Sequence, residues 1–402
     1  MIIGAESDDG SNRMSYRGLA VMAAVVGMGG VVLGWSPAAG QTAPSVARVR
    51  AKVKPVEKNV DPTSNYVPPR TPDGQPDLQG VWNNNTLMPF ERPKGLPEFF
   101  TEAELKARME RDKQRFDDPT YHSEKFKIEE HAAKGPVNTD APTLESIVRS
   151  LEHGGNGENP DQESNLHYDM SNYGTDRHQA PLIWSRRTSI IVGPEGTIPP
   201  LTPEAHKRLV DRATKAMGHE FDGPENRLLS IRCLVKSATG PPMRPVEYNS
   251  DFRIVQGPGY VSIQHEMARD RIIPLDGRPH LPKNIRQLQG DSVGHWEGNT
   301  LVVDSTNFTD ENPFPGAENV HLIERFRLVD PDTLIYQFTL EDPGMWVRPW
   351  SGEITATRSD FPMYEYACSE GDYDLATALR GARVAEKAAA GKAAKAAKEG
   401  GN

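Results

Sequence analysis

The spacing of apolar residues along the chain changes near its middle. In the first half, three segments have the composition and the 3.6-residue period of helices. Thr101 and Glu104 stand at the spacing of a capping box, and Thr202 followed by Pro203 is typical of a helix start. The sequence therefore predicts three helices here, separated by loops rich in proline, glycine and asparagine. The predicted helices lie at 101–116, 143–155 and 201–218.

In the second half, apolar residues alternate with polar ones, which is the period of β-strands with one buried face. Short segments of this kind follow one another at hairpin spacing, and turn signals such as Gly-Pro-Gly and Glu-Gly-Asn divide them. The predicted strands lie at 252–256, 259–267, 299–306, 321–329, 333–341, 345–357 and 362–368. This pattern predicts a mainly β (α+β) fold, an antiparallel β-barrel or sandwich with a helical N-terminal layer.

Both ends of the chain differ in composition from the part between them. An apolar run at 19–34, with small residues before a cleavage site, predicts a signal peptide, and an uncleaved membrane anchor is the alternative. Acidic residues ahead of this run leave open whether Met1 or Met14 is the true start. The predicted parts are a signal peptide at 1–40, an extended proline-rich arm at 41–76, a single β-rich domain with helices in its first half at 77–383, and a low-complexity Ala/Lys tail at 384–402.

Charge and cysteine content narrow the partners and the compartment. The formal net charge is −10, so nucleic acid is not expected as a partner. A cleaved signal peptide would place the protein in the periplasm or outside the cell, without membrane contact after cleavage. Cys233 and Cys368 are an even pair in an exported chain, so we predict one disulfide bond, with two separate buried thiols as the alternative.

The alternation also identifies polar residues that share a face with apolar ones. His265, Glu324 and Arg348 are each expected on the apolar face of a strand, and so inside the barrel. A structural Glu324–Arg348 salt bridge is one interpretation, because buried charges normally have partners. As a catalytic site, His265 would transfer a proton, Glu324 would orient it or act as a second acid or base, and Arg348 would bind an anionic or hydroxylated group. Its apolar walls would be Tyr336, Trp346 and Trp350.

A proline-rich loop supplies further candidates. Arg278 and His280 stand in the sequence Asp-Gly-Arg-Pro-His, where polar groups have no packing reason to gather, so we predict that they contact a substrate. His295 and Glu297 stand at the mouth of a tight hairpin, where exposure to solvent already explains them. Neither a metal nor another cofactor is predicted, because no set of histidines and carboxylates has the spacing of a known metal motif.

Several blocks of the sequence resemble known families. The run Ile272–Phe308 and later blocks such as Tyr-Glu-Tyr-Ala-Cys resemble a large, uncharacterised family of exported bacterial proteins of the acidobacterial and sphingomonad type. This resemblance extends over nearly the whole mature chain and implies no particular activity. Gly80-Val81-Trp82 is similar to the G-x-W that opens the first strand of lipocalins, so the later meander resembles a calycin-like barrel. That second resemblance implies a barrel that receives a hydrophobic small molecule.

Three classes of function fit these observations. The first is an acid–base enzyme, a lyase, hydratase or hydrolase acting on an aromatic, terpenoid or glycosidic compound. The second is a carrier or sensor that binds such a molecule without turnover, and the third is an envelope module that docks another protein. The first two share a small, partly apolar ligand in a β-rich pocket. The inward polar residues favour the enzyme.

Overall fold

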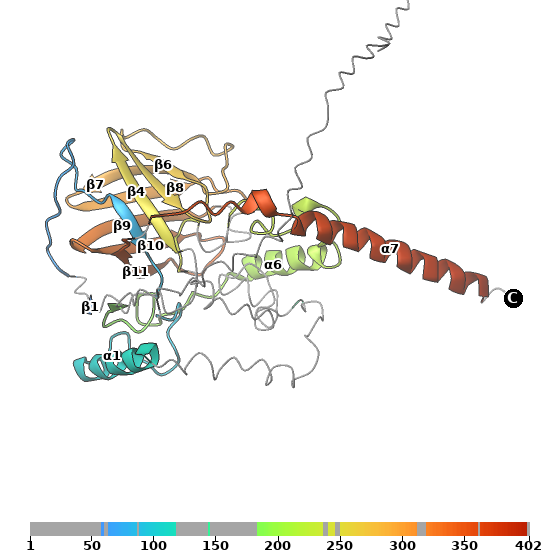
Figure 1. Cartoon of the computed structure of the whole chain (residues 1–402), viewed down its shortest axis with the longest axis horizontal. Coiled ribbons are helices and arrows are strands. Elements are labelled where there is room, and N and C mark those ends of the chain that lie inside the picture. Colours follow the sequence, from blue (N-terminus) through green and yellow to red (C-terminus); the bar gives the residue numbers. More distant parts are fainter. Residues whose placement is uncertain are drawn as a thin grey trace, which may run out of the picture. The chain divides into compact units, whose positions relative to one another are not determined.

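A large β-sheet dominates the computed structural model of the chain (Figure 1). The structure describes residues 58–59, 63–86, 88–117, 144, 183–235, 240–245, 250–311, 319–360 and 362–399. The predicted signal peptide and most of the predicted arm lie outside the described residues, as does nearly all of the predicted helix at 143–155. None of the described helices is both long enough and apolar enough to cross a membrane.

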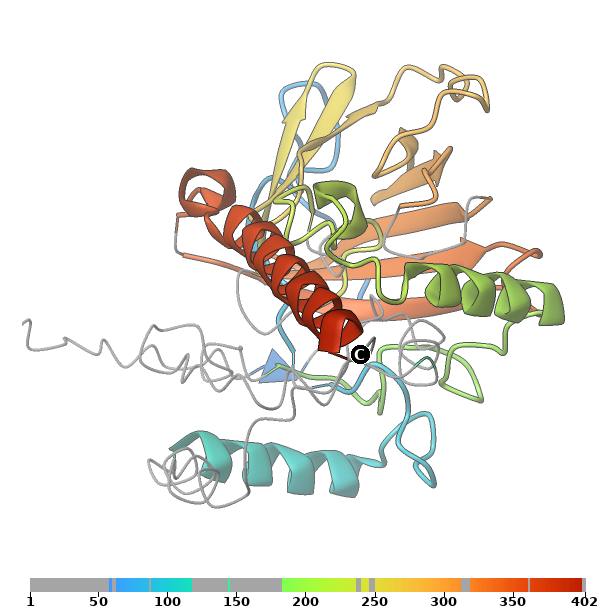
Figure 2. The same ribbon diagram turned by 90° about the vertical axis from the view of Figure 1, so that its right-hand side faces the viewer.

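Two of the predicted helices are present, and both begin where the sequence indicates. Helix α1 (Glu102–Asp117) starts at the capping box, in which the backbone N–H of Thr101 donates to the Glu104 carboxylate and the Glu104 N–H donates to the Thr101 hydroxyl. Helix α6 (Pro203–Ala216) starts at Thr202, whose hydroxyl accepts a backbone N–H of the first turn. Figure 2 shows α6, in green, alongside the orange strands of the sheet.

A further helix, α7 (Asp374–Glu399), covers the C-terminal segment. It continues through residues 383 and 384, so the Ala/Lys tail and the preceding residues form one uninterrupted helix. Alanine, lysine and glutamate have high helix propensities, which explains a helix whose second half is exposed all round. Near its start, the Arg383 guanidinium donates to the carbonyl oxygens of Phe221 and Asp222 and so ties the helix to the segment after α6.

Nine strands form one sheet in the order β6-β5-β4-β2-β11-β10-β9-β8-β7. The strands are β2 (Gly80–Asn83), β4 (Asp251–Gly257), β5 (Tyr260–His265), β6 (Arg271–Pro274), β7 (Asp291–Glu297), β8 (Thr300–Thr306), β9 (His321–Asp330), β10 (Thr333–Glu341) and β11 (Trp350–Arg358). All neighbouring strands in this order are antiparallel. The sheet curls into a nearly closed barrel, which confirms the predicted fold class. A separate parallel pair joins β1 (Lys58–Asn59) to β3 (Ile183–Trp184).

The edge strands β6 and β7 meet at the seam of the barrel. They are the first and the ninth strand of the order, and because neighbouring strands alternate in direction, these two run the same way. Side chains close this seam. A Cβ atom on Gly294 would lie 2.8 Å from Ile273 Cγ2 and 2.8 Å from Leu275 Cδ2, so only glycine lets β7 approach β6 so closely. Nearby, Arg271 Nη2 donates to Ser292 Oγ across the seam at 3.2 Å.

Parallel neighbours cannot be joined by a tight hairpin, and residues 275–290 form the longer connection from β6 to β7. We call this segment the crossover loop. The N–H of Leu281 donates to Asp291 Oδ2 at 2.8 Å, and Asn307 Nδ2 donates to the Leu281 carbonyl at 2.8 Å. The Gln287 N–H donates to the Asn307 carbonyl at 2.9 Å. These bonds fix the crossover loop against the start of β7 and the end of β8.

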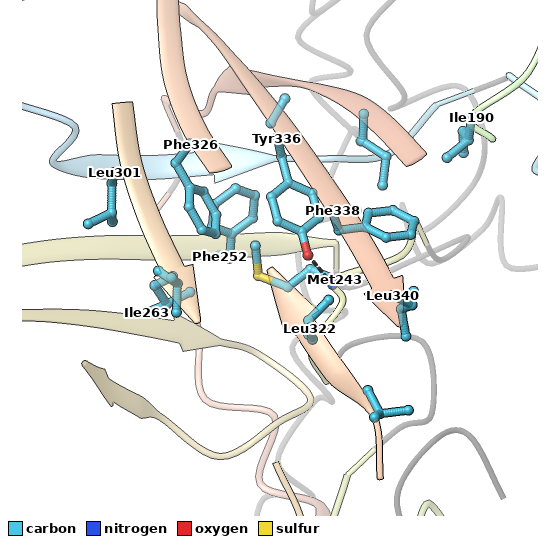
Figure 3. Packing of buried hydrophobic residues seen from close by; sticks show 14 of the residues in the cluster. Ile190, Met243, Phe252, Ile263, Leu301, Leu322, Phe326, Tyr336, Phe338 and Leu340 are labelled. Atoms are coloured by element: carbon cyan, nitrogen blue, oxygen red, sulfur yellow. Dashed lines mark hydrogen bonds between the residues drawn. The ribbon is translucent and has the colours of Figure 1, made fainter. Parts of the chain in front are cut away.

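The barrel encloses a packed apolar core. Alternate residues of the strands point inward, and Figure 3 shows Phe326, Tyr336 and Phe338 packed together with Met243 below the Tyr336 ring. The ring centroids of Phe326 and Tyr336 are 4.9 Å apart, and those of Tyr336 and Phe338 are 5.8 Å apart. Met243 belongs to a segment outside the sheet, 240–245, and is 1% exposed. The loop segment therefore contributes to the filling of the barrel.

The sheet divides into two halves that are each continuous in sequence. The strands before the crossover loop (β2, β4, β5 and β6) are neighbours in the sheet, and so are the strands after it (β7 to β11). Apart from the seam, the halves meet where β2 pairs with β11 through Asn83–Thr357 and Trp82–Arg358. The predicted disulfide bond is present between Cys233 and Cys368, whose sulfur atoms are 2.03 Å apart, and it links the two halves across 135 residues.

Two predicted strands differ from the structure. The segment predicted at 345–357 becomes a strand only at Trp350, because the backbone N–H groups of Met345 and Trp346 both bond to the Asp342 carbonyl in a turn. Pro349, which has no N–H to donate, stands directly before the strand. The prediction at 362–368 is wrong: residues 362–367 have no regular structure, and a short 3-10 helix, η4 (Cys368–Gly371), follows.

Candidate functional site

The structure places two of the three predicted catalytic side chains inside the barrel. His265 is 5% exposed and Glu324 is 0% exposed. Arg348 instead lies in the loop before β11, where its exposed guanidinium forms an ion pair with Glu195 at the surface. The inward orientation predicted for Arg348 is therefore wrong, because side chains alternate only within a strand and this residue precedes one.

Glu324 is held by a different arginine, Arg271 of β6. Arg271 Nη1 donates to Glu324 Oε1 at 3.0 Å, and Nη2 donates to Oε2, so the pair is bidentate. Arg271 Nη2 also lies 3.2 Å from Ser292 Oγ and 3.3 Å from Ser305 Oγ. With an exposed fraction of 6% for Arg271, this is a buried ion pair with its own hydroxyl partners.

Tyr336 completes this network. Its hydroxyl donates to Glu324 Oε1 at 2.8 Å and accepts the backbone N–H of Met243 at 3.0 Å. Burial, together with the neighbouring negative charge of Glu324, raises the pKa of Tyr336 well above its ordinary value, so the phenol stays protonated and donates. Both oxygens of Glu324 are thus engaged by Arg271 and Tyr336. Among the described residues, no hydrogen bond joins Glu324 to His265.

The predicted apolar walls are part of the filled core. Tyr336, Trp346 and Trp350 are 1%, 4% and 3% exposed, and the two indole rings pack edge to face with centroids 5.7 Å apart. A cavity of about 10 Å³, at the lower limit of room for one water, is lined by residues such as Ser185 and Glu353. It adjoins β11 and not the three predicted walls.

His265 is a neutral imidazole inside the barrel. Burial lowers its pKa to about 4, so the ring is uncharged near pH 7. The Met267 N–H points at His265 Nδ1 at 3.4 Å, which leaves the ring proton on Nε2. Among the described residues, Nε2 has no hydrogen-bond partner. A buried N–H donor without an acceptor costs about 1–3 kcal/mol, so this atom needs an explanation.

In the part of the chain that the structure describes, two other buried polar atoms at the same end of the barrel have no hydrogen-bond partner. They are Asn84 Oδ1, an acceptor, and Arg271 Nε, a donor. The strand register places all three side chains at the same end. The Asn84 N–H donates to the Ser250 carbonyl just before β4, and His265 at the end of β5 pairs with Phe252 near the start of β4. Arg271 is the first residue of β6, which pairs with β5. We call this the polar end of the barrel, defined by Asn84, His265, Arg271, Ser292 and Ser305.

A second group of polar side chains crosses the outer face of the sheet. It alternates carboxylates and imidazoles in the order Asp291, His280, Asp304, His321, Glu341, and we call it the His–carboxylate chain. His280 Nδ1 lies 2.9 Å from Asp291 Oδ2, and His280 Nε2 lies 3.2 Å from Asp304 Oδ1. His321 Nε2 lies 2.9 Å from the same Asp304 oxygen, and its Nδ1 lies 3.6 Å from Glu341 Oε2.

Fold and topology bring this chain together. Asp291, Asp304, His321 and Glu341 occupy outward positions on β7, β8, β9 and β10, which are consecutive in the sheet. His280 comes from the crossover loop, which is present because β6 and β7 are parallel. The imidazoles and Asp304 are partly open to solvent, with side-chain exposures of 25% for His280, 35% for Asp304 and 36% for His321.

The other sequence candidates lie at the surface. Arg278 forms a bidentate pair with Asp276 and donates to the Tyr260 hydroxyl at 3.0 Å. Hydrogen bonds from Arg278 lower the pKa of Asp276 to about 2, so the pair is neutral as a unit. His295 and Glu297 contact each other at 3.3 Å on the exposed hairpin, at a distance from the barrel interior.

Several residues of these networks were missed by sequence reasoning. Arg271 carries a usable signal, since it shares a face with the buried Ile273 in the short strand Arg-Ile-Ile-Pro. Asp304 and Glu341 give no such signal, because polar residues on outward strand positions are the ordinary case. His280, Asp291 and His321 all appear among the histidines and carboxylates of the sequence, but only the fold shows that they are neighbours.

Fold and side chains together define a nearly closed antiparallel β-barrel whose interior is polar at one end. Comparison of the chain with family models, with curated proteins and with solved structures gave no match. Within the described ranges, no group of three or more His, Cys, Asp or Glu side chains is placed to hold a metal ion. In the His–carboxylate chain, the nitrogen and oxygen atoms contact one another directly.

Proposed function

We propose that this is an exported protein that binds a small, partly apolar molecule at the polar end of its barrel. The observation that carries the proposal is the unpartnered His265 Nε2, a buried donor directed into the interior. Asn84 Oδ1 and Arg271 Nε are further unpartnered atoms at this end, so a ligand with a hydroxyl or carbonyl group would find both donors and an acceptor.

His265 acts in this proposal as a hydrogen-bond donor. Its pKa of about 4 makes the ring a weak base at neutral pH, and the proton on Nε2 is the one a ligand oxygen would accept. Glu324 and Arg271 form an ion pair with each other, and this pair lines one side of the site. The apolar part of the ligand would contact Met243, Phe252 and Tyr336, and Met243 would have to move aside because it fills the interior.

Export rests on the apolar run at 19–34 and agrees with the disulfide bond, since disulfides form and persist in oxidising compartments. The mature protein would then meet its ligand in the periplasm or in the medium. Intact-mass analysis of protein recovered from these fractions checks this part of the proposal: an N-terminus near Gln41 is expected. Full-length chain in the membrane fraction would contradict it.

Ligand binding is tested by thermal unfolding against a panel of aromatic, terpenoid and glycosidic compounds. A compound at 100 times its Kd stabilises the folded protein by about 2.7 kcal/mol, which is a measurable rise in Tm. His265→Leu should remove the rise, whereas His295→Leu, a change of an exposed histidine, should preserve it. The proposal fails if no compound raises the Tm, or if His265→Leu responds like the unmodified protein.

A further inference from the structure

We propose that the second half of helix α7 is a docking surface for a second copy of this chain. In the resulting dimer, lysines on the helix of each copy bind carboxylates that lie at the start of the helix of the other copy. We call residues 387–398 the lysine segment and residues 364–374 the acidic segment. The surface is separate from the polar end of the barrel and does not depend on the ligand proposed there.

The lysine segment presents positive charge on one side of a helix. All of its residues other than its lysines are alanine or glycine, and it contains no acidic residue. Its lysines are Lys387, Lys392, Lys395 and Lys398. The helical period places Lys387, Lys395 and Lys398 within about 80° of one another around the axis, with alanines on the opposite side. A partner that contacts this one side therefore meets three lysines together.

The rest of the molecule covers only the first turns of α7. Arg383 donates to two carbonyl oxygens of the segment after α6, and each side chain from 383 to 398 is exposed. The side chains of the first turns that are partly buried stand at helical spacing, and they are Leu375, Ala378, Leu379 and Ala382. The lysine segment thus follows the docked turns as a helix that is open to solvent on all sides.

The acidic segment has the complementary chemistry. It contains no lysine or arginine, and its carboxylates are Glu365, Glu370, Asp372 and Asp374. Tyr364 and Tyr373 are 72% and 76% exposed, so their rings are available to the methylene stems and the charge of a lysine. The Cys368 disulfide and the bond from the Leu375 N–H to Asp372 Oδ1 hold this segment at the start of α7.

The geometry of α7 keeps the two segments of one molecule apart. The helix is straight (Figure 1, red), and a rise of 1.5 Å per residue puts Lys387 about 20 Å and Lys398 about 36 Å from Asp374 along the axis. Charges in solution are screened over about 8 Å at physiological ionic strength. The lysine segment therefore finds its complement on another molecule.

A two-fold axis satisfies both segments of both copies. When two α7 helices lie antiparallel, the lysine segment of each copy lies beside the acidic segment of the other, so one symmetric arrangement makes the contact twice. Once the first contact forms, the second is in effect intramolecular, which strengthens the pair. The formal net charge of the chain is −10, so two copies repel each other except where opposite charges are matched locally.

Sedimentation velocity of the full chain over a range of protein concentrations tests the dimer. At about 50 mM NaCl the screening length is about 14 Å and a dimer is expected, whereas at about 500 mM, with a length of about 4 Å, monomer is expected. Combined Lys387→Glu, Lys395→Glu and Lys398→Glu should raise the dimer Kd at least about tenfold, because three charges change sign in each of two contacts. Arginine at the same three positions is the matched control and should preserve the dimer.

A charge-swap experiment separates docking from folding. The double variant Glu365→Lys and Glu370→Lys should also be monomeric at about 50 mM NaCl. An equimolar mixture of this variant with the triple lysine-to-glutamate variant should form a mixed dimer, because each contact again joins opposite charges. A misfolded variant would not recover in this way, and far-UV circular dichroism of each variant alone should show the helix content of the unmodified protein.

Three results would overturn the inference: a chain that is monomeric at both salt concentrations, a dimer that withstands the three lysine-to-glutamate changes, or two charge variants that do not combine. Co-sedimentation of a monomeric chain with phosphatidylglycerol vesicles through the same lysines would identify an anionic lipid surface as the partner instead. The thermal-shift result on His265 is independent of all these outcomes.

Discussion

Replacing Glu324 by glutamine is the sharpest test of the barrel interior. The substitution keeps the size of the side chain and one acceptor for the Tyr336 hydroxyl, but it removes the charge that faces Arg271. Arg271 has 5% of its side chain exposed and stays ionised, so its charge would remain buried without a counter-ion. Removing one partner of a buried pair costs about 3–5 kcal/mol, and we expect a loss of this size in the free energy of unfolding.

The assay is urea denaturation followed by tryptophan fluorescence. Glu324→Gln should lower the midpoint while the slope with urea stays the same, which marks a change in stability alone. Glu297→Gln removes a carboxylate from the exposed pair with Arg325 and should cost less than about 1 kcal/mol. A double variant with Arg271→Met and Glu324→Leu should recover most of the loss. A change below about 1 kcal/mol for Glu324→Gln would refute the assignment of this pair.

Three further predictions concern other parts of the fold. Reducing the Cys233–Cys368 bond should lower the unfolding free energy by about 4–5 kcal/mol, as expected for a closed loop of this length, and thiol titration of unreduced, denatured protein should find none free. His265 has a pKa of about 4 in the folded protein and about 6.5 in the unfolded chain, so the unfolded chain binds the proton first as the pH falls. The free energy of unfolding should therefore be highest above about pH 6.5 and fall by about 3 kcal/mol towards pH 4. His265→Gln should remove that part of the pH dependence in urea titrations. Gly294→Val should cost about 1–3 kcal/mol by forcing β7 away from Ile273, and an unchanged urea midpoint would show that the seam is loose.

The sequence predicts most of the barrel because each strand carries its own pattern. Alternation in β5, β9 and β10 places His265, Glu324 and Tyr336 on the buried face, and the structure agrees. The pattern fails at Arg348, where the turn at Asp342 and the proline at 349 delay the strand until Trp350. A local period contains no information on where a strand begins.

The candidate sites depend on register and topology, which single-strand patterns do not contain. Arg271 and Glu324 are 53 residues apart and meet only because the sheet closes at the seam. His280 reaches Asp304 because two parallel edge strands require a crossover, and nothing near His280 in the sequence indicates this. The sequence does mark the loop itself, because its polar residues gather where no packing requires them.

Because each half of the sheet is continuous in sequence, one proteolytic cleavage between the halves would leave every strand intact. A nick in the crossover loop, for instance by trypsin at the exposed Lys283, would sever the chain without breaking any strand. The two fragments would each contain a contiguous half-barrel, and the Cys233–Cys368 bond would keep them covalently joined. Such a nicked molecule should migrate as one species on non-reducing gels and as two on reducing gels. The same architecture offers a split-protein pair in which the reassembly of β2 with β11 and of the seam restores the barrel.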